Sequence, residues 1–157
     1  MSDNGGERIN ALDDHHCFGC GRLNPYGLRL AFYRLSDGDG VWAPFTPQLE
    51  HEGYAGLIHG GIVSTLLDEA MAWALYAQDN WAVTAKMAIT FRKPVETGVP
   101  TRVVGRLVSD RGRLLEVAGE LRRAADDLLL AEATGTFARV PERQAREWKE
   151  RYLGVQN

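Results

Sequence analysis

Apolar residues follow a helical spacing between His59 and Gln78. They stand at positions 62, 63, 66, 67, 70, 71, 74 and 75, and residues three and four positions apart share one side of a helix. The pattern therefore predicts one long helix with a continuous buried face. Gly60 and Gly61 open this helix and leave its first backbone N–H groups accessible to an acceptor atom.

A second face of the predicted helix carries polar groups. Gly61, Ser64, Thr65 and Asp68 share this side by their spacing. Gly61 and Asp68 stand roughly 10 Å apart along the axis, so they cannot act on one atom within one helix. If they cooperate, the donor and the carboxylate come from two copies of the chain, which predicts a symmetric homodimer. Otherwise Asp68 is a solvated helix residue and the glycines are a loose cap.

Shorter segments on both sides of the helix have the alternation or the composition of strands. They span residues 28–35, 41–46, 82–91, 101–109, 113–122 and 128–140, with turns at 36–40, 96–98, 110–112 and 125–127. Residues 141–153 predict a short charged helix that begins at a proline. Two strands, a long helix and four more strands indicate an α+β fold, with an antiparallel sheet that covers one central helix.

The length of 157 residues favours one domain. We expect a flexible N-terminal segment over 1–14, a single domain over 15–140, and a short helix and tail over 141–157. A net charge of −3 gives no reason to expect a nucleic-acid partner. No apolar run is long enough to span a membrane, and the N-terminus lacks the apolar core of a signal peptide. Two cysteines suit a reducing compartment, so we expect a cytoplasmic protein without a membrane partner.

A Cys-x-x-Cys pair, Cys17 and Cys20, lies near the N-terminus with His15 and His16 beside it. Such a pair can hold zinc, act as a redox couple, or form a turn of small residues. A second Cys-x-x-Cys is absent from the sequence. We therefore predict a turn and no metal.

The order of these motifs resembles the hotdog-fold thioesterases, and most of all the phenylacetate-degradation (PaaI-type) acyl-CoA thioesterases. The resemblance runs from about residue 15 to residue 140. It rests on Cys-Phe-Gly-Cys-Gly at 17–21, Asn-Pro-Tyr-Gly-Leu at 24–28, the stretch into His-Gly-Gly at 54–61, Leu-Leu-Asp at 66–68, the strand at 83–94 and Gly-Arg at 112–113. The acid nine residues after the histidine makes the match specific.

The resemblance assigns catalytic roles to five residues. It implies that Asp68 is a nucleophile or a base for water, and that the N–H of Gly60, with Gly61 beside it, polarises the thioester carbonyl. Thr84 would stand near the acid and its water, and His59 near the substrate carbonyl. Glu69 is rotated by roughly 100° from Asp68, so we expect no role for it.

Many relatives place an Asn or Gln several residues before His-Gly-Gly, where it helps to hold the water. Spacing puts Gly53 at that position in this chain. The helper is therefore missing or replaced, and His51, Glu52 and Thr84 are the open alternatives.

For the CoA portion, the resemblance implies strand ends and a later turn. Thr90 and Arg92 stand at the end of one strand, and Arg111 and Arg113 flank Gly112. Guanidinium groups suit phosphate because they present several donors in a fixed fork.

The resemblance implies an acyl-CoA thioesterase, a hydrolase that works as a homodimer or homotetramer without metal or redox cofactor. A non-catalytic acyl-CoA-binding module is the alternative, and a hydratase would need an Asp/His dyad that the sequence does not show. The acyl group and the choice between CoA and a carrier protein stay open. Four apolar residues of the helix region can line an acyl pocket or simply form the core: Met71, Trp73, Leu75 and Trp81.

Overall fold

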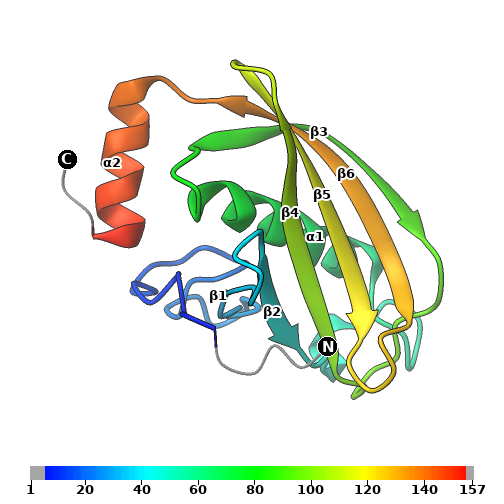
Figure 1. Ribbon diagram of the computed structural model, residues 1–157. Coiled ribbons are helices and arrows are strands. Elements are labelled where there is room, and N and C mark those ends of the chain that lie inside the picture. Colours follow the sequence, from blue (N-terminus) through cyan, green and yellow to red (C-terminus); the bar gives the residue numbers. More distant parts are fainter. Residues whose placement is uncertain (1–5, 155–157) are drawn as a thin grey trace.

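The computed structural model describes residues 6–154, which form an antiparallel sheet wrapped around one long helix (Figure 1). The helices are α1 (Gly60–Tyr76) and α2 (Glu142–Leu153), and a 3-10 turn spans Leu49–His51. The strands are β1 (Tyr33–Arg34), β2 (Val41–Phe45), β3 (Ala82–Phe91), β4 (Thr101–Asp110), β5 (Leu114–Arg123) and β6 (Leu129–Arg139). The predicted α+β hotdog fold is confirmed, with the long helix and five of the strands within two residues of their predicted ends.

The strand order is β1-β2-β4-β5-β6-β3, and every neighbouring pair is antiparallel. β3 follows α1 in the chain but lies at the far edge of the sheet. Ala82 pairs with Arg139 of β6, and Phe91 pairs with Ala131. One side of β3 therefore has no partner strand among the described residues.

The apolar stripe of α1 packs on the concave face of the sheet, as the spacing predicts. Its buried members are Val63, Leu66, Leu67, Ala70, Met71, Trp73, Ala74 and Leu75. Three glycines on adjacent strands, Gly105, Gly119 and Gly135, lie beneath the helix. A Cβ built on Gly105 would stand 2.1 Å from the carbonyl oxygen of Ala70, and one on Gly135 would stand 3.1 Å from the sulfur of Met71. The absence of side chains at these positions lets the helix approach the sheet.

The strand predicted over residues 28–35 is wrong for most of its length, because only Tyr33–Arg34 form a strand. The side chain of Asn10 takes the place of a partner strand here. Its Nδ2 donates to the carbonyl of Leu30 at 2.7 Å, and its Oδ1 accepts from the N–H of Phe32 at 2.8 Å. Backbone groups in an extended segment need partners, and here a buried amide supplies them.

The expectation of a flexible segment over residues 1–14 is corrected for residues 8–14. The N–H of Ile9 donates to the carbonyl of Phe32 at 2.9 Å, and Asn10 is 1% exposed. Arg8 also forms a bridge with Tyr33. Residues 1–5 and 155–157 of the predicted termini lie outside the described residues.

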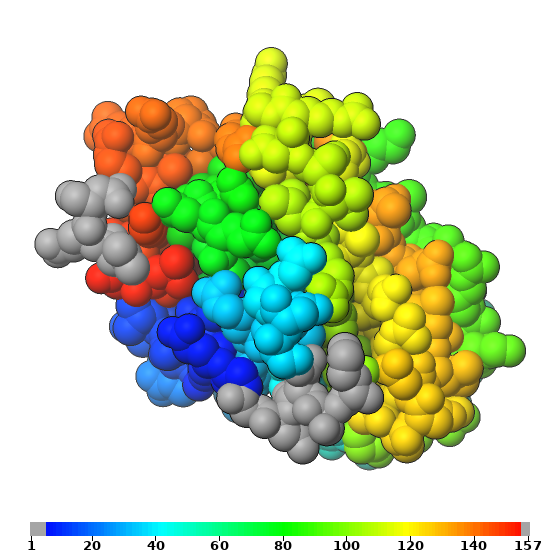
Figure 2. Space-filling view, viewed as in Figure 1, coloured from blue at the N-terminus to red at the C-terminus, as the bar shows by residue number. Residues whose placement is uncertain are grey.

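α2 lies beside the N-terminal loop (Figure 2). Arg151 forms an ion pair with Asp14 at 3.1 Å, and the rings of His15 and Tyr152 meet edge to face at 5.0 Å. Within residues 6–154, neither helix has the length and apolar character required to cross a membrane.

The glycine contact beneath α1 gives a stability prediction. Gly105→Ala should lower the free energy of unfolding by at least about 2 kcal/mol, because the added Cβ forces the helix and the strand apart. Val108→Ala, at an exposed position of the same strand, should change it by less than about 0.5 kcal/mol. Urea unfolding followed by circular dichroism measures both. Equal effects of the two substitutions would contradict the close packing.

Candidate active site

His59 caps the start of α1 with its own side chain. Its Nδ1 accepts a hydrogen bond from the N–H of Gly61 at 2.8 Å. An accepting Nδ1 carries no proton, so this bond places the ring proton of the neutral imidazole on Nε2. The histidine therefore braces the turn, and the N–H of Gly61 is already engaged.

The N–H of Gly60 is the donor that this cap leaves open. Among residues 6–154, no protein acceptor is seen for it. A Cβ at Gly60 would come no closer than 3.7 Å to the ring of Phe91, so the space in front of this glycine is open. Of the two predicted donors, the structure thus leaves Gly60 free and uses Gly61 for the helix cap.

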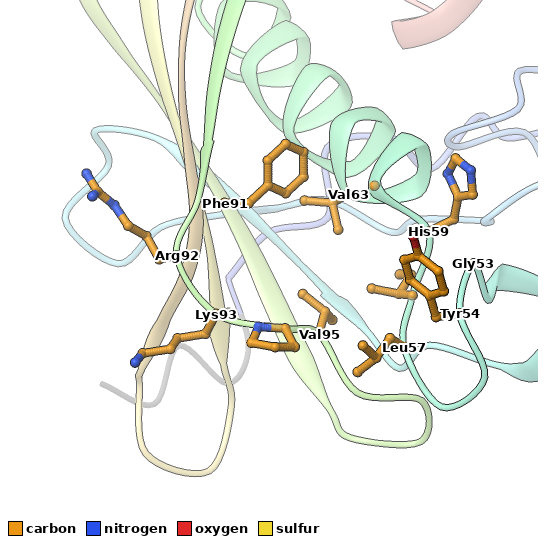
Figure 3. A pocket seen from close by; sticks show the side chains of 12 residues that line it. Gly53, Tyr54, Leu57, His59, Val63, Phe91, Arg92, Lys93 and Val95 are labelled. Atoms are coloured by element: carbon orange, nitrogen blue, oxygen red, sulfur yellow. The ribbon is translucent and has the colours of Figure 1, made fainter.

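This free donor faces a groove of about 730 Å³. Its lining comes from the loop before α1, the first turn of α1 and the end of β3: Gly53, Tyr54, Leu57, Ile58, His59, Gly60, Val63, Phe91, Arg92, Lys93, Pro94 and Val95. Figure 3 shows Phe91 and Val63 side by side, whereas Arg92 and Lys93 point away from the helix. The groove is therefore apolar beside the donor and cationic at its rim.

The loop before α1 is held by its own side chains. Glu52 accepts from the N–H of Gly56 at 2.8 Å and from the hydroxyl of Thr97 at 2.6 Å. Nδ1 of His51 accepts from the N–H of Gln48 at 2.9 Å. A Cβ at Gly53 would stand 3.1 Å from Cα of His59. Position 53 therefore packs tightly against the histidine, and a larger residue there would require a small shift of His59.

Asp68 and Thr84 meet at the open side of α1. The hydroxyl of Thr84 donates to Oδ1 of Asp68 at 2.6 Å. His51 and Glu52 are tied into the loop, so Thr84 is the one of the three alternative helpers seen to contact the acid. Gly60 precedes Asp68 by eight residues, which is about 12 Å along the helix. One chain therefore brings the acid and Thr84 together but does not bring them to the donor.

The four residues predicted to bind CoA fall at two ends of the sheet. Thr90 lies on the face of β3 that also carries Ala88, near Glu132 of β6. Arg92 forms an ion pair with Glu132 at 3.1 Å. Arg111 and Arg113 flank the β4–β5 turn, which lies at the Ala82 end of β3. Nine strand residues, or about 30 Å, separate the two ends. Within one chain these residues do not converge.

Arg139 of β6 holds the β4–β5 turn in place. Arg139 pairs with both carboxylate oxygens of Asp110, each at 2.8 Å, and also donates to the carbonyl of Gly112. The hydrogen bonds from Arg139 and from the N–H of Gly112 hold the pKa of Asp110 well below its usual range. Arg111 and Arg113 are exposed, and no ion pair is seen for either within residues 6–154. Their guanidinium groups are available for an anion.

Glu69 is the residue that the sequence reasoning missed. Glu69 lies three residues after Leu66 and four before Trp73, so it shares one side of α1 with two apolar residues. An acidic residue in such a row was the signal that the sequence offered. Its Oε1 accepts from Sγ of Cys17 at 3.4 Å, and its Oε2 is buried. Burial raises the pKa of Glu69 to about 8, and the charge of Cys17 adds to the effect.

A second, smaller cavity of about 170 Å³ adjoins Glu69 and contains aromatic side chains. Trp73 and Trp81 line it and are 3% and 4% exposed. Met71 and Leu75 are fully buried in the core. None of these four predicted acyl-pocket candidates lines the groove at Gly60. In the single chain they form the core and the wall of this second cavity.

A sheet curved around one helix, with a free donor at the start of that helix, defines a hotdog domain. Comparison with known proteins points to the same class. Residues 55–130 match the family model of the thioesterase superfamily. The chain has the hotdog fold and is similar to the thioesterase superfamily over these residues, as the sequence motifs predicted.

Curated relatives are similar over part of their length. An uncharacterised protein of Schizosaccharomyces pombe is 30% identical over 111 residues, covering 68% of this chain and 63% of the relative. Acyl-coenzyme A thioesterase THEM4 of Mus musculus is 29% identical over 100 residues, covering 63% of this chain and 43% of the relative. The chain thus spans less than two thirds of the length of these relatives.

Solved structures share the fold. A thioesterase superfamily protein superposes with a TM-score of 0.74 at 25% identity, covering 87% of this chain and 69% of the other. The E. coli PaaI protein superposes with a TM-score of 0.66 at 19% identity, covering 73% of this chain and 81% of the other. A Streptococcus mutans protein bound to acetyl CoA superposes with a TM-score of 0.62 at 24% identity, covering 65% of this chain and 82% of the other. The last two similarities are below 25% identity and support the fold alone.

Proposed function

We propose that this chain is an acyl-CoA thioesterase whose active sites form between two copies. The proposal rests on one observation: the proposed oxyanion donor and the proposed acid lie at separate positions along α1. The free N–H of Gly60 lies at the groove, and the Asp68–Thr84 pair lies about 12 Å further along the same exposed face. An antiparallel arrangement of two helices would set the donor of each copy against the acid of the other.

The unpartnered edge of β3 supports this arrangement. β3 is ten residues long, and Val83 and Phe91 are 46% and 56% exposed. A long edge strand with exposed apolar side chains invites pairing with another strand. Antiparallel pairing of β3 with its own copy would set the Phe91 end of one chain against the Ala82 end of the other. The separated Arg92 and Arg113 would then come from two chains to one site.

The chemistry assigns a role to each member of the set. The thioester oxygen accepts from the N–H of Gly60, which stabilises the negative charge that develops there. Asp68 takes a proton from a water molecule, whose oxygen attacks the carbonyl carbon, or attacks that carbon itself. Thr84 orients the carboxylate through the 2.6 Å hydrogen bond. The carbon–sulfur bond then breaks, and the CoA thiolate leaves and is protonated. Where Asp68 itself attacks, a water molecule then hydrolyses the acyl–Asp68 anhydride, which frees the acid and regenerates the carboxylate. This hydrolysis requires neither metal nor redox cofactor.

CoA is the proposed thiol portion of the substrate. The mouse relative is named an acyl-CoA thioesterase, and the Streptococcus mutans structure holds acetyl CoA. The exposed cations Arg111 and Arg113 suit its phosphates, because guanidinium groups bind phosphate in a bidentate manner. A PaaI-type aryl specificity is the finer form of the proposal, and the likeness to the E. coli PaaI fold is its support.

Asp68→Asn tests the chemistry. The amide is nearly isosteric but cannot act as a base or a nucleophile, so kcat should fall by at least about 10²-fold while acyl-CoA binding stays near that of the parent chain. Steady-state hydrolysis of a panel of aliphatic and aromatic acyl-CoAs measures kcat, and calorimetry with a non-hydrolysable analogue measures binding.

Asp39→Asn is the matched control, since Asp39 lies in the β1–β2 turn away from the groove. It should leave kcat unchanged. Glu69→Gln is not a neutral control, because its carboxyl is buried against Cys17. If Asp68→Asn keeps most of its activity, the acid is assigned wrongly. Binding without hydrolysis by the parent chain would instead favour a non-catalytic acyl-CoA-binding protein.

Arg113→Ala tests the anchoring of CoA. KM for an acyl-CoA should rise about tenfold with little change in kcat, because the lost charged contact is common to the ground and transition states. With a truncated thioester that lacks the nucleotide, the substitution should have no effect on KM. Equal losses with both substrates would exclude a nucleotide contact.

Ala88→Asp tests the assembly. Ala88 is exposed near the middle of β3, so two copies of the new carboxylate would meet across a β3–β3 pair. Such like-charge contacts cost several kcal/mol, and the dimer should weaken at least tenfold with a parallel loss of activity. Light scattering over a concentration series measures the assembly. Val108→Asp, on exposed β4, is the control and should remain dimeric. A monomeric parent chain that hydrolyses thioesters would refute the two-chain site.

A further inference from the structure

Three potential metal ligands meet at the closed end of the small cavity, apart from the groove. They are Sγ of Cys17, Sγ of Cys20 and a carboxylate oxygen of Glu69, and all three atoms lie within 4.8 Å of one another. The cysteines come from the N-terminal loop and the glutamate from α1. The thioester chemistry proposed above uses none of them.

The loop that carries the cysteines forms a closed turn. The N–H of Gly21 donates to the carbonyl of Cys17 at 2.8 Å, which closes the turn that carries both sulfurs. The Cys-x-x-Cys spacing is that of one half of a structural zinc site.

Glycines in this loop let it reach Glu69. A Cβ at Gly19 would stand 2.2 Å from Cγ of Glu69, and a Cβ at Gly21 would stand 2.4 Å from the carbonyl oxygen of His15. The loop is therefore shaped to bring both sulfurs against the carboxylate. A plain turn of small residues would not require that contact.

Oε2 of Glu69 is buried, and among residues 6–154 no hydrogen bond to it is seen. A buried carboxylate oxygen without a partner is costly, and a cation is one group that compensates it. The cluster thus joins two sulfurs and an oxygen that lacks a ligand. A cation at this position would satisfy that oxygen and both sulfurs together.

We propose that Cys17, Cys20 and Glu69 bind a zinc ion, with the fourth position open to the small cavity. Zinc prefers tetrahedral sulfur, nitrogen and oxygen ligands at about 2.0–2.3 Å, which places neighbouring ligand atoms roughly 3.3–3.8 Å apart. Small rotations of the three side chains close the present spacing to that range. Binding would displace the thiol protons and tie the N-terminal loop to the middle of α1.

A disulfide between Cys17 and Cys20 is the competing use of the same pair. It would remove the thiol that donates to Oε1 of Glu69, and both carboxylate oxygens would then lack a partner. A metal ion instead satisfies the carboxylate and both sulfurs together. The geometry of Glu69 therefore favours metal over a redox couple.

The test uses the full chain, purified with a phosphine reductant, stripped with a chelator and then loaded with Zn²⁺ or Co²⁺. We expect one zinc per chain by elemental analysis, loss of both reactive thiols in the loaded protein, and a thiolate-to-cobalt charge-transfer band. Cys17→Ser and Cys20→Ser should abolish the band. Glu69→Gln should weaken zinc binding by at least about tenfold, the smallest loss typical even of an outer-shell partner.

His16→Ala is the matched control, because this neighbouring histidine is exposed and lies outside the cluster. It should bind zinc as the parent chain does. The stoichiometry and the thiol count of the parent chain decide the proposal even if a cysteine variant fails to fold. A reduced parent chain that takes up no zinc, or zinc retained in both serine variants, would overturn it. A Cys17–Cys20 disulfide in a protein that binds no zinc after reduction would identify the pair as a redox element.

Discussion

Gly105 brings the sheet and the backbone of α1 into direct contact, since a Cβ there would stand 2.1 Å from the carbonyl oxygen of Ala70. Gly119 and Gly135 continue this row of positions without side chains across the next two strands. Interiors are close-packed, so a helix that lies so near a sheet can use only one face for the core. Its remaining face is left to the surface. That face carries both the donor end and the acid of the proposed site.

The single chain leaves this surface incomplete in a consistent way. The helix start offers an unengaged N–H beside an apolar groove, and the middle of the helix offers a carboxylate held by Thr84. The edge strand β3 runs past both. A helix of fixed rise cannot bend to bring Gly60 to Asp68. In the proposed function, a two-fold copy of the same surface would supply the missing half at each end, so the proposed chemistry depends on the assembly.

The regular elements could be predicted because their signals are local. The period of α1 and the alternation in β3–β6 depend only on residues near in the chain. The His-Gly-Gly entry with Asp68 indicated the site proposed above, and its catalytic role stays a prediction. The segment over 28–32 was not predicted correctly, because its backbone hydrogen bonds go to the N-terminal loop rather than to a strand. Their partners include the side chain of Asn10 and the carbonyls of Phe18 and Gly19. The sequence also could not place Arg92 and Arg113 relative to each other, since strand order sets which turns share an end of the sheet. Their role in binding CoA stays a prediction.

The angular position of Glu69 on the helix did not predict its environment. Its offset of roughly 100° from Asp68 correctly removes it from the face of the acid, but that offset turns it toward the N-terminal loop rather than into solvent. There it meets the two sulfurs, and Gly19 leaves the space for it. Adjacent carboxylates on one helix thus face two different environments: Asp68 a hydroxyl at the open surface, Glu69 a buried thiol. The Cys-x-x-Cys loop therefore contacts the same turn of α1 from which Asp68, the proposed catalytic acid, projects.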